Sequence, residues 1–410
     1  MSPDEVITDD AMPEDGNIAT LAEGVEEHID PLKSWQILGS GIADWVTSTL
    51  EARLAKVTLL PVKALGDSNY LRAALGNIWL LFPVIGVTLG VLASRNAAGY
   101  GQVIPPVAWI FLAIMVLGVF DAASGLLAFL IYAVATIVAG DWGNLHSVAA
   151  IAGLGVMWFG GAQLAHNFRP VGLWDDEPSR GIRAWRIVGD LIILPVAGAF
   201  VLGKISLVFS YFVGLKVPIA EKETLVTAVA FGALFLRAAA ESTVIHNYRN
   251  RIASIHRPRL PKRWIPLDIL AFAVTVFIAY VFIWSFIGNT AQTFVILGIF
   301  CAFGPVTYLG RQFPESTLIS RLTPKNLLKV AIIILAAEII VREMGRNYSG
   351  NPTQVMGWAF VALGVVVLLF LIIEQFNGKP WPETWIIRIL GAASIVFFVA
   401  VAQGWVAIAA

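Results

Sequence analysis

The stretch Thr224–Arg263 constrains the fold of this chain most, because it joins a long apolar run to a strongly basic segment. Residues 225–236 are almost all apolar, and six Lys or Arg residues then lie between Arg249 and Arg263 with no Asp or Glu among them. A short basic loop at the end of a membrane-spanning helix is typical of the cytoplasmic side. The stretch therefore predicts a transmembrane helix whose C-terminal end faces the cytoplasm.

The composition places the whole chain in the same class. Of its 410 residues, 58% are hydrophobic and only 14% are charged, and the mean hydropathy is +0.76. Soluble domains contain roughly 45–50% apolar and about 25% charged residues. We therefore expect an all-α polytopic membrane protein of the cytoplasmic (inner) membrane, with no soluble domain that would bind nucleic acid.

Apolar runs recur from residue 70 to the end of the chain, and a bilayer span needs about 20 apolar residues. Alternation from the basic loop places the N-terminus in the cytoplasm and the C-terminus outside. Cations are concentrated in the predicted inner loops, with Lys216, Lys222, Arg342 and Arg346 as exceptions. The predicted spans number about eleven and cover residues 73–94, 104–120, 122–140, 148–167, 187–214, 223–246, 266–288, 291–310, 327–342, 354–374 and 386–408.

Two segments precede the transmembrane bundle of residues 70–410. Residues 1–33 form an acidic tail, which we expect to be disordered and to be able to bind a basic protein partner. Residues 34–66 place apolar side chains at three- and four-residue steps, which predicts an amphipathic cytoplasmic helix in the headgroup plane. Packing of that helix against another cytoplasmic segment is the alternative. The basic surplus after the tail predicts contact with an anionic inner leaflet.

The long apolar run 103–140 requires a break, since one helix of that length would extend about 57 Å. Asp121 is the one plausible position for it, as the N-cap of a second helix. The break is interpreted as a tight hairpin turn, with two re-entrant halves as the alternative. The glycine-rich segment Ala149–Ala162 predicts a thin helix in close contact with a neighbour.

Similar residues recur where predicted hairpins begin and end. Trp185 and Asp190 begin one hairpin, Trp264 and Asp268 begin another, and His-Asn-aromatic-Arg sequences at residues 166–169 and 246–249 close two of them. This pattern predicts a bundle of repeated two-helix hairpins, about four in number. Chance placement of polar residues at helix ends would explain the same pattern without duplication.

Ionisable residues inside apolar runs are the candidate functional residues, because each costs roughly 2.5–3.5 kcal/mol at the bilayer centre. The candidates are Asp121, Lys204, Arg237 and Glu241, which we expect to line a substrate or ion pathway. Arg237 and Glu241 are one helical turn apart and would also neutralise each other. Pairing of Lys204 with Glu241 or Asp121, across helices, is the alternative. For Asp121, simple helix capping competes with a role in the pathway.

No sequence motif identifies an enzyme, a metal site or a cofactor. The nucleotide-binding, zinc-protease and serine-hydrolase motifs are absent, and the single Cys301 excludes a disulfide framework. Asp141 and His146 lie in one outer loop, where an acid–base pair would be possible. The favoured function is a permease that moves a small solute or ion. A scaffold that recruits partners through its N-terminal region and a lipid-modifying enzyme are the alternatives.

Overall fold

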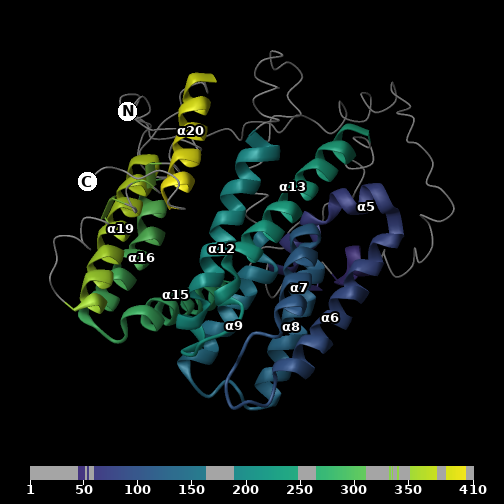
Figure 1. The fold of residues 1–410 in the computed structure, drawn as a ribbon, viewed down its shortest axis with the longest axis horizontal. Helices are drawn as coiled ribbons and strands as arrows, with labels where there is room; N and C mark the ends of the chain where they lie inside the picture. The colour runs from purple at the N-terminus through teal and green to yellow at the C-terminus, as the bar shows by residue number, and fades with distance from the viewer. Residues whose placement is uncertain are drawn as a thin grey trace, which may run out of the picture.

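The computed structural model describes residues 45–50, 53–54, 60–162, 189–247, 265–310, 332–333, 335, 339–340, 351–375 and 385–402. Every regular element among these residues is helical (Figure 1). Four helices are long and apolar enough to cross a membrane: Asn69–Ala97, Leu191–Val213, Ala220–Val244 and Ile269–Ile287. Several shorter apolar helices accompany them. The described residues thus confirm an all-helical protein with membrane-spanning segments.

Most predicted spans coincide with a helix in the part of the chain that the structure describes. The acidic tail 1–33 lies outside the described residues, and the predicted span 327–342 is described only at isolated helical positions. The main helices are α4 (Leu60–Asp67), α5 (Asn69–Leu75), α6 (Leu81–Ala97), α7 (Ala108–Phe120), α8 (Ala122–Val138), α9 (Leu145–Trp158), α12 (Leu194–Val213), α13 (Glu223–Asn247), α15 (Ile265–Ile287), α16 (Ala291–Gly310), α19 (Pro352–Gln375) and α20 (Trp385–Ala402).

The helices form two groups joined by α15 (Figure 1). Helices α6 to α9, α12 and α13 form the larger group, and α16 packs along α19 in the smaller one. Helix α15 contacts α9 and α12 on one side and α16 and α19 on the other. Helix α20 packs on the beginning of α12 through Ile395 and Ile193.

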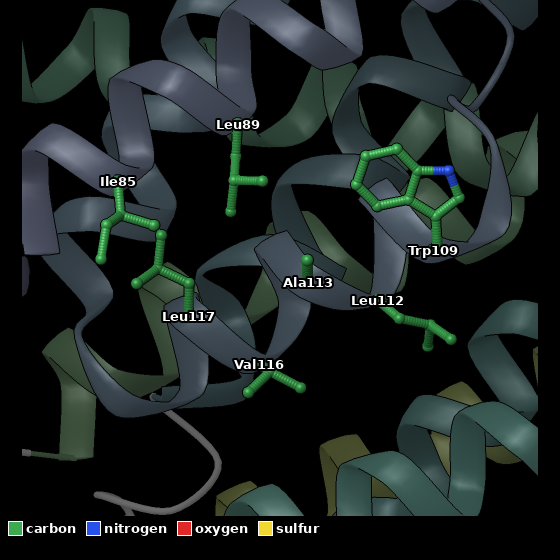
Figure 2. Close-up of a pocket in the computed structure, with 7 residues that line it drawn as sticks. All are labelled: Ile85, Leu89, Trp109, Leu112, Ala113, Val116 and Leu117. Atoms are coloured by element: carbon green, nitrogen blue, oxygen red, sulfur yellow. The ribbon is translucent and has the colours of Figure 1, made fainter.

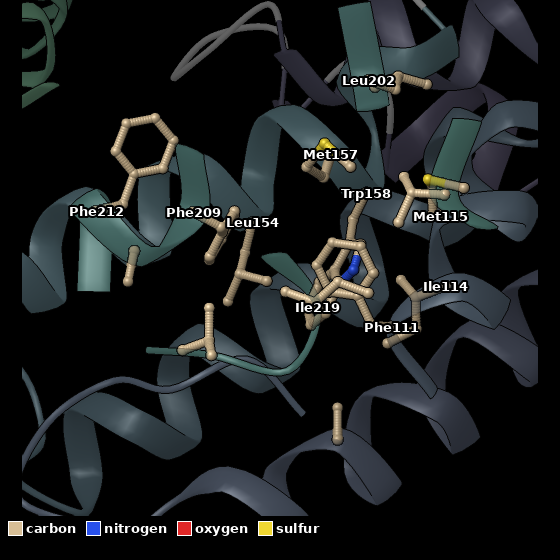
Figure 3. Packing of buried hydrophobic residues seen from close by; sticks show 14 of the residues in the cluster. Phe111, Ile114, Met115, Leu154, Met157, Trp158, Leu202, Phe209, Phe212 and Ile219 are labelled. Carbon is tan, nitrogen blue, oxygen red and sulfur yellow. The ribbon is translucent and has the colours of Figure 1, made fainter. Parts of the chain in front are cut away.

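Aromatic side chains join several helices in the mainly aliphatic core of the larger group (Figure 3). Phe111 of α7 contacts Trp158 of α9 and Phe209 of α12 edge to face, with ring centroids 6.0 and 6.1 Å apart. Such pairs add about 0.5–1.5 kcal/mol to the area that they bury. The contacts therefore fix three helices around one another.

Small residues let the backbones of neighbouring helices approach closely. Gly86 and Gly90 of α6 face Ser124 and Ala128 of α8, where an added Cβ would lie 2.6 and 2.9 Å from the two carbonyl oxygens. On α9, a Cβ on Gly153 would lie 2.9 Å from the ring of Phe212. The prediction of a thin glycine helix in close contact with its neighbours is confirmed at this position.

The segment predicted as an amphipathic helix over 34–66 is described only in part. Residues Trp45–Leu50 are helical, and α4 packs against α8 with Val62, Ala64, Leu65 and Asp67 buried. The end of this segment is therefore buried against α8, a helix predicted as a membrane span, and not against another cytoplasmic segment. This placement brings Asp67 into the interior, where it takes part in the site described next.

Candidate functional site

The chain breaks between α7 and α8 at Asp121, as the length of the apolar run predicts. Asp121 has extended backbone angles, with φ −138° and ψ 96°, and the two helices pack against each other beside the break. A Cβ on Gly125 of α8 would lie 2.6 Å from the Cα of Gly118 in α7. The two halves therefore form a tight helical hairpin.

The Asp121 side chain does not cap α8 in the predicted way. Asp121 occupies the N-cap position, but its carboxyl group makes no capping hydrogen bond. Instead it accepts hydrogen bonds from the hydroxyls of Ser68, which precedes α5, and Ser124 in α8. Asp121 is completely buried. In place of the predicted cap, the Asp121 side chain connects the break to the α4–α5 corner through Ser68.

Arg237 of α13 reaches the same region, and its side chain is 0% exposed. Its Nη2 lies 2.5 Å from Oδ1 of Asp67, and its Nη1 donates a hydrogen bond to the carbonyl oxygen of Val119. The Tyr70 hydroxyl donates to the carbonyl oxygen of Phe120 at 2.7 Å. Carbonyls at a helix C-terminus lack intrahelical donors and carry partial negative charge. Arg237 and Tyr70 therefore stabilise the end of α7.

Glu241 lies one turn after Arg237 on α13, as the sequence requires. Its Oε2 is 4.0 Å from Nε of Arg237, and the side chain is largely buried. That distance exceeds a hydrogen bond, whereas the Asp67 contact is within one. Arg237 is therefore paired primarily with Asp67. Sequence reasoning missed this residue, although Gly66-Asp67-Ser68 at the start of a span was the available signal.

The structure brings Asp121, Arg237 and Glu241 to one buried region, together with Asp67. We name these four residues the inner charge cluster. Lys204 does not belong to it, and its expected pairing with Glu241 or Asp121 is wrong. Its Nζ lies 2.7 Å from Oε1 of Glu223, at the start of α13, and both side chains are partly exposed.

The Lys204–Glu223 pair is distant from the inner charge cluster along α13. Fourteen residues separate Glu223 from Arg237 in the sequence, which is about 21 Å along a helix. Between them α13 buries Val226, Ala230 and Ala233 in the apolar core. The two charged groups are thus separated by apolar packing.

Because the Lys204–Glu223 pair is partly exposed, we expect it to contribute little to the stability of the fold. Exposed ion pairs contribute about 0.2–1 kcal/mol, so we expect Lys204→Gln to lower the unfolding free energy by less than about 1 kcal/mol. Thermal unfolding in detergent would measure the change against the wild type. A large loss of stability would show that this pair is coupled to the core in a way that its exposure does not indicate.

Asp141 and His146 do not form an acid–base pair. The Asp141 carboxylate is fully buried and accepts backbone hydrogen bonds from Gly99 (2.6 Å) and Gly101 (2.7 Å). His146 lies with Nδ1 3.2 Å from the Phe212 carbonyl oxygen and with its ring 4.8 Å from that of Trp284. Asp141 therefore joins two loops. Its carboxylate is hydrogen-bonded to the backbone and not to His146, so the structure does not support the acid–base pair that the sequence suggested.

This role of Asp141 leads to a stability prediction. Gly99 and Gly101 have φ values of 90° and 75°, a conformation that other residues rarely adopt. Because glycine has many accessible backbone conformations, the carboxylate fixes a loop that would otherwise be free to adopt others. Hydrogen bonds to a charged group contribute about 1.5–3 kcal/mol, so Asp141→Ala should lower stability by at least about 2 kcal/mol. Thermal unfolding checks this, with exposed Trp142→Ala as the neighbouring control.

An apolar groove of about 650 Å³ lies between α6 and α7 (Figure 2). Ile85 and Leu89 line it from α6, and Trp109, Leu112 and Val116 line it from α7 together with Ala113 and Leu117. The only polar atom on these side chains is the indole nitrogen of Trp109. The groove suits hydrocarbon and offers no donor set for a polar solute.

Several predicted features fall outside the described residues. The side chains of Asp190, His246 and Asp268 lie there, as do residues 166–169, so the repeated hairpin ends are not described. Among the residues that the structure describes, no group of three His, Cys, Asp or Glu side chains could hold a metal ion. Any functional role of the inner charge cluster must therefore be argued from its own chemistry.

The fold and the site together define the class of this protein. Its described elements are all helical, four of them are long and apolar enough to cross a membrane, and ionisable side chains are buried together where three helical segments meet. No protein-family model, curated protein or solved structure matches the chain.

Proposed function

We propose that the protein is a permease of the cytoplasmic membrane that moves a small solute or ion. In this proposal about eleven helices cross the bilayer, the N-terminus is cytoplasmic, and the inner charge cluster is the binding region of the transport pathway. The basic segment 249–263 supports this orientation. In this orientation the cluster would lie in the inner half of the membrane, since Arg237 and Glu241 lie toward the C-terminal end of α13.

The observation that carries the proposal is the burial of Arg237 with Asp67 and two further carboxyl groups. Arg237 and Asp121 are completely buried, and Asp67 and Glu241 are each 6% exposed. Replacing buried ion pairs by apolar residues of similar volume often leaves stability unchanged or increases it. Packing alone therefore does not require charges at this depth, whereas a pathway for an ion or polar solute does.

Transport through this region would require α13 to move. The apolar layer around Val226, Ala230 and Ala233 separates the inner charge cluster from the Lys204–Glu223 pair. In the proposed orientation this pair joins the middle of α12 to the outer end of α13. The described arrangement therefore represents a state closed toward the outside, and Lys204 would meet a solute only when the layer opens. Alternating access of this kind is general among transporters.

The transport test uses the full-length protein in liposomes. Protein-dependent uptake would be measured for a panel of labelled amino acids, organic acids and inorganic ions. We expect uptake of at least one class, and Glu241→Gln should reduce it strongly because it removes a charge from the cluster. Glu221→Gln is the matched control, since the Glu221 side chain is 69% exposed and lies beside Lys216, in the helical turn that precedes α13. If no compound in the panel enters faster than in empty liposomes, the permease proposal is rejected.

A topology test checks the orientation independently. Cys301 is the only cysteine in the sequence, so Cys301→Ser provides a background for single introduced cysteines. Gly143→Cys should react with a membrane-impermeant maleimide from outside intact cells, and Ser254→Cys in the basic segment should react only after lysis. The reverse labelling would overturn the proposed orientation.

A scaffold remains the second candidate, and one observation favours it. The inner charge cluster fastens α4 and α5 to the bundle through Asp67 and Ser68, so the segment that follows the acidic tail is firmly anchored. Deleting residues 1–44 removes the tail and leaves every described helix intact. A scaffold should then lose its partner in a pull-down, whereas a permease should continue to transport.

A further inference from the structure

We propose that Asp121 is the site at which a proton binds and is released, and that a proton is the coupling ion of the transport reaction. The inference deepens the proposed function and rests on it. It is carried by the surroundings of one carboxyl group, which lies in a helix break, is completely buried, and contacts two hydroxyl groups.

No cation pairs with Asp121 in the part of the chain that the structure describes. Among the described residues, the ion pairs of Arg237 are with Asp67 and Glu241, and Asp121 belongs to no ion pair. A buried carboxylate without a cation pays a large desolvation penalty, which protonation removes. The surroundings of Asp121 therefore accommodate the neutral acid as well as the anion.

Asp141 is also fully buried, but its hydrogen-bond partners differ from those of Asp121. Its two oxygens accept hydrogen bonds from the backbone N–H groups of Gly99 and Gly101, which can only donate. The partners of Asp121 are instead the hydroxyls of Ser68 and Ser124, which can donate to the anion or accept from the acid. The two carboxyl groups thus differ in whether their partners can accept a hydrogen bond.

The Ser68 hydroxyl has a second hydrogen-bond acceptor within reach. Ser68 Oγ lies 3.2 Å from the carbonyl oxygen of Ala64. When Asp121 is ionised, the Ser68 hydroxyl donates to its Oδ1. When a proton from water binds the carboxylate, the new O–H bond donates to Ser68 Oγ, and the Ser68 hydroxyl turns to the Ala64 carbonyl. Release reverses these steps and returns the proton to water, so the exchange needs no other reactant.

Other polar groups lie near the carboxyl group of Asp121. Asp67 acts on it electrostatically, and Tyr70 donates to the carbonyl oxygen of the preceding residue, Phe120. From α13, Arg237 donates to the carbonyl oxygen of Val119, and Glu241 lies 4.0 Å from the Arg237 Nε. The indole of Trp79 lies beside Asp121, and its N–H can only donate. This donor stabilises the carboxylate when Asp121 becomes charged.

The experiment follows the carboxyl group directly by infrared difference spectroscopy. The full-length protein in nanodiscs would be compared between acidic and alkaline pH in potassium buffer. We expect the absorption of a protonated carboxyl C=O at acidic pH, its loss at alkaline pH, and its absence from the Asp121→Asn variant. Asp141→Asn is the matched control and should leave the band unchanged. A wild-type spectrum without a titrating band, or a band that persists in Asp121→Asn, would overturn the proposal.

Two further measurements separate a proton from a bound cation and do not depend on the folding of Asp121→Asn. Selective isotope labelling of aspartate should shift the band in the wild-type protein, and a band that does not shift would reject its assignment to aspartate. Replacing potassium with sodium should leave the titration unchanged, and suppression of the band by sodium would instead assign the site to that cation. In the Ser68→Ala variant the carboxyl group of Asp121 should remain protonated to higher pH, because the Asp121 anion loses a hydrogen-bond donor.

Failure of this inference is distinguishable from failure of the proposed function. If Asp121 titrates but the liposomes take up no solute, the proton site stands and the permease proposal fails. If solute uptake is observed but no carboxyl band titrates, the permease stands and the coupling proposal fails. When both hold, uptake by the wild type should acidify the liposome lumen, and uptake by Asp121→Asn should not.

Discussion

Arg237→Met is expected to destabilise the protein by about 3–5 kcal/mol, because it leaves the buried Asp67 carboxylate without its cation. The Asp67 contact at 2.5 Å is the short ion pair of Arg237, and both side chains are almost inaccessible to solvent. The Val119 carbonyl at the end of α7 also loses its donor. Asp67→Leu should have an effect of similar size, since it leaves the guanidinium charge buried. The midpoint and free energy of unfolding in mixed detergent micelles measure both variants.

The double variant Asp67→Leu/Arg237→Met tests whether the pair itself is responsible. Removing both charges leaves neither Asp67 nor Arg237 as a buried ion without the other, so the double variant should be more stable than either single variant. Glu241→Gln should cost clearly less than Asp67→Leu, because Glu241 lies 4.0 Å from the guanidinium and makes no direct hydrogen bond to it there. If the losses from Asp67→Leu and Arg237→Met simply add in the double variant, the assigned pairing is contradicted.

Arg237 itself could be identified from the sequence, because a cation within an apolar run needs a buried partner. The identity of that partner could not. The nearest carboxylate along the helix is Glu241, and the i, i+4 rule selects it. Asp67 lies 170 residues away, and a fold that contains this contact cannot be inferred from helical periodicity. The sequence therefore predicts which residues are costly to bury, but not how tertiary packing pairs them.

The break at Asp121 shows the same division between local and long-range information. An apolar run too long for a single crossing, with one Asp near its middle, is enough to predict where the helix ends. The cap expected from local chemistry is replaced by hydroxyl contacts, one of which comes from residue 68. Lys204 was misassigned for a related reason. Its partner Glu223 is the first residue of the predicted span 223–246, but only Glu241 and Asp121 were considered as partners.

The all-helical class and most helix positions were predictable, because length and hydropathy determine them with little tertiary information. The close contacts among α7, α8 and α9 were not. Gly118 and Gly125 lie seven residues apart on either side of the break, and both face the carbonyl of Trp158. No periodic pattern in one helix reveals that a backbone atom from another helix occupies the space beside a glycine.

Gly118→Ala is expected to be the most disruptive single-methyl change in the described core. An ideal Cβ at Gly118 would lie 1.5 Å from the carbonyl oxygen of Trp158 and 2.7 Å from its carbonyl carbon. Overpacking usually costs about 1–3 kcal/mol and occasionally more. Since a backbone carbonyl cannot rotate away as a flexible side chain does, we expect at least about 3 kcal/mol here. The loss would appear as a lower unfolding midpoint in detergent and a reduced yield of monodisperse protein.

Gly232→Ala provides the matched control on α13, since an added Cβ there meets no atom within 4 Å. Alanine favours a helix interior over glycine by roughly 0.5–1 kcal/mol, so this variant should be as stable as the wild type or more so. The comparison separates steric contact from the general effect of removing a glycine. Displacing α9 from Gly118 should also move the Asp121 break, so any Gly118→Ala protein that folds should show an altered carboxyl titration. A stable Gly118→Ala variant with unchanged titration would reject the close approach of the Trp158 carbonyl to the α7–α8 hairpin.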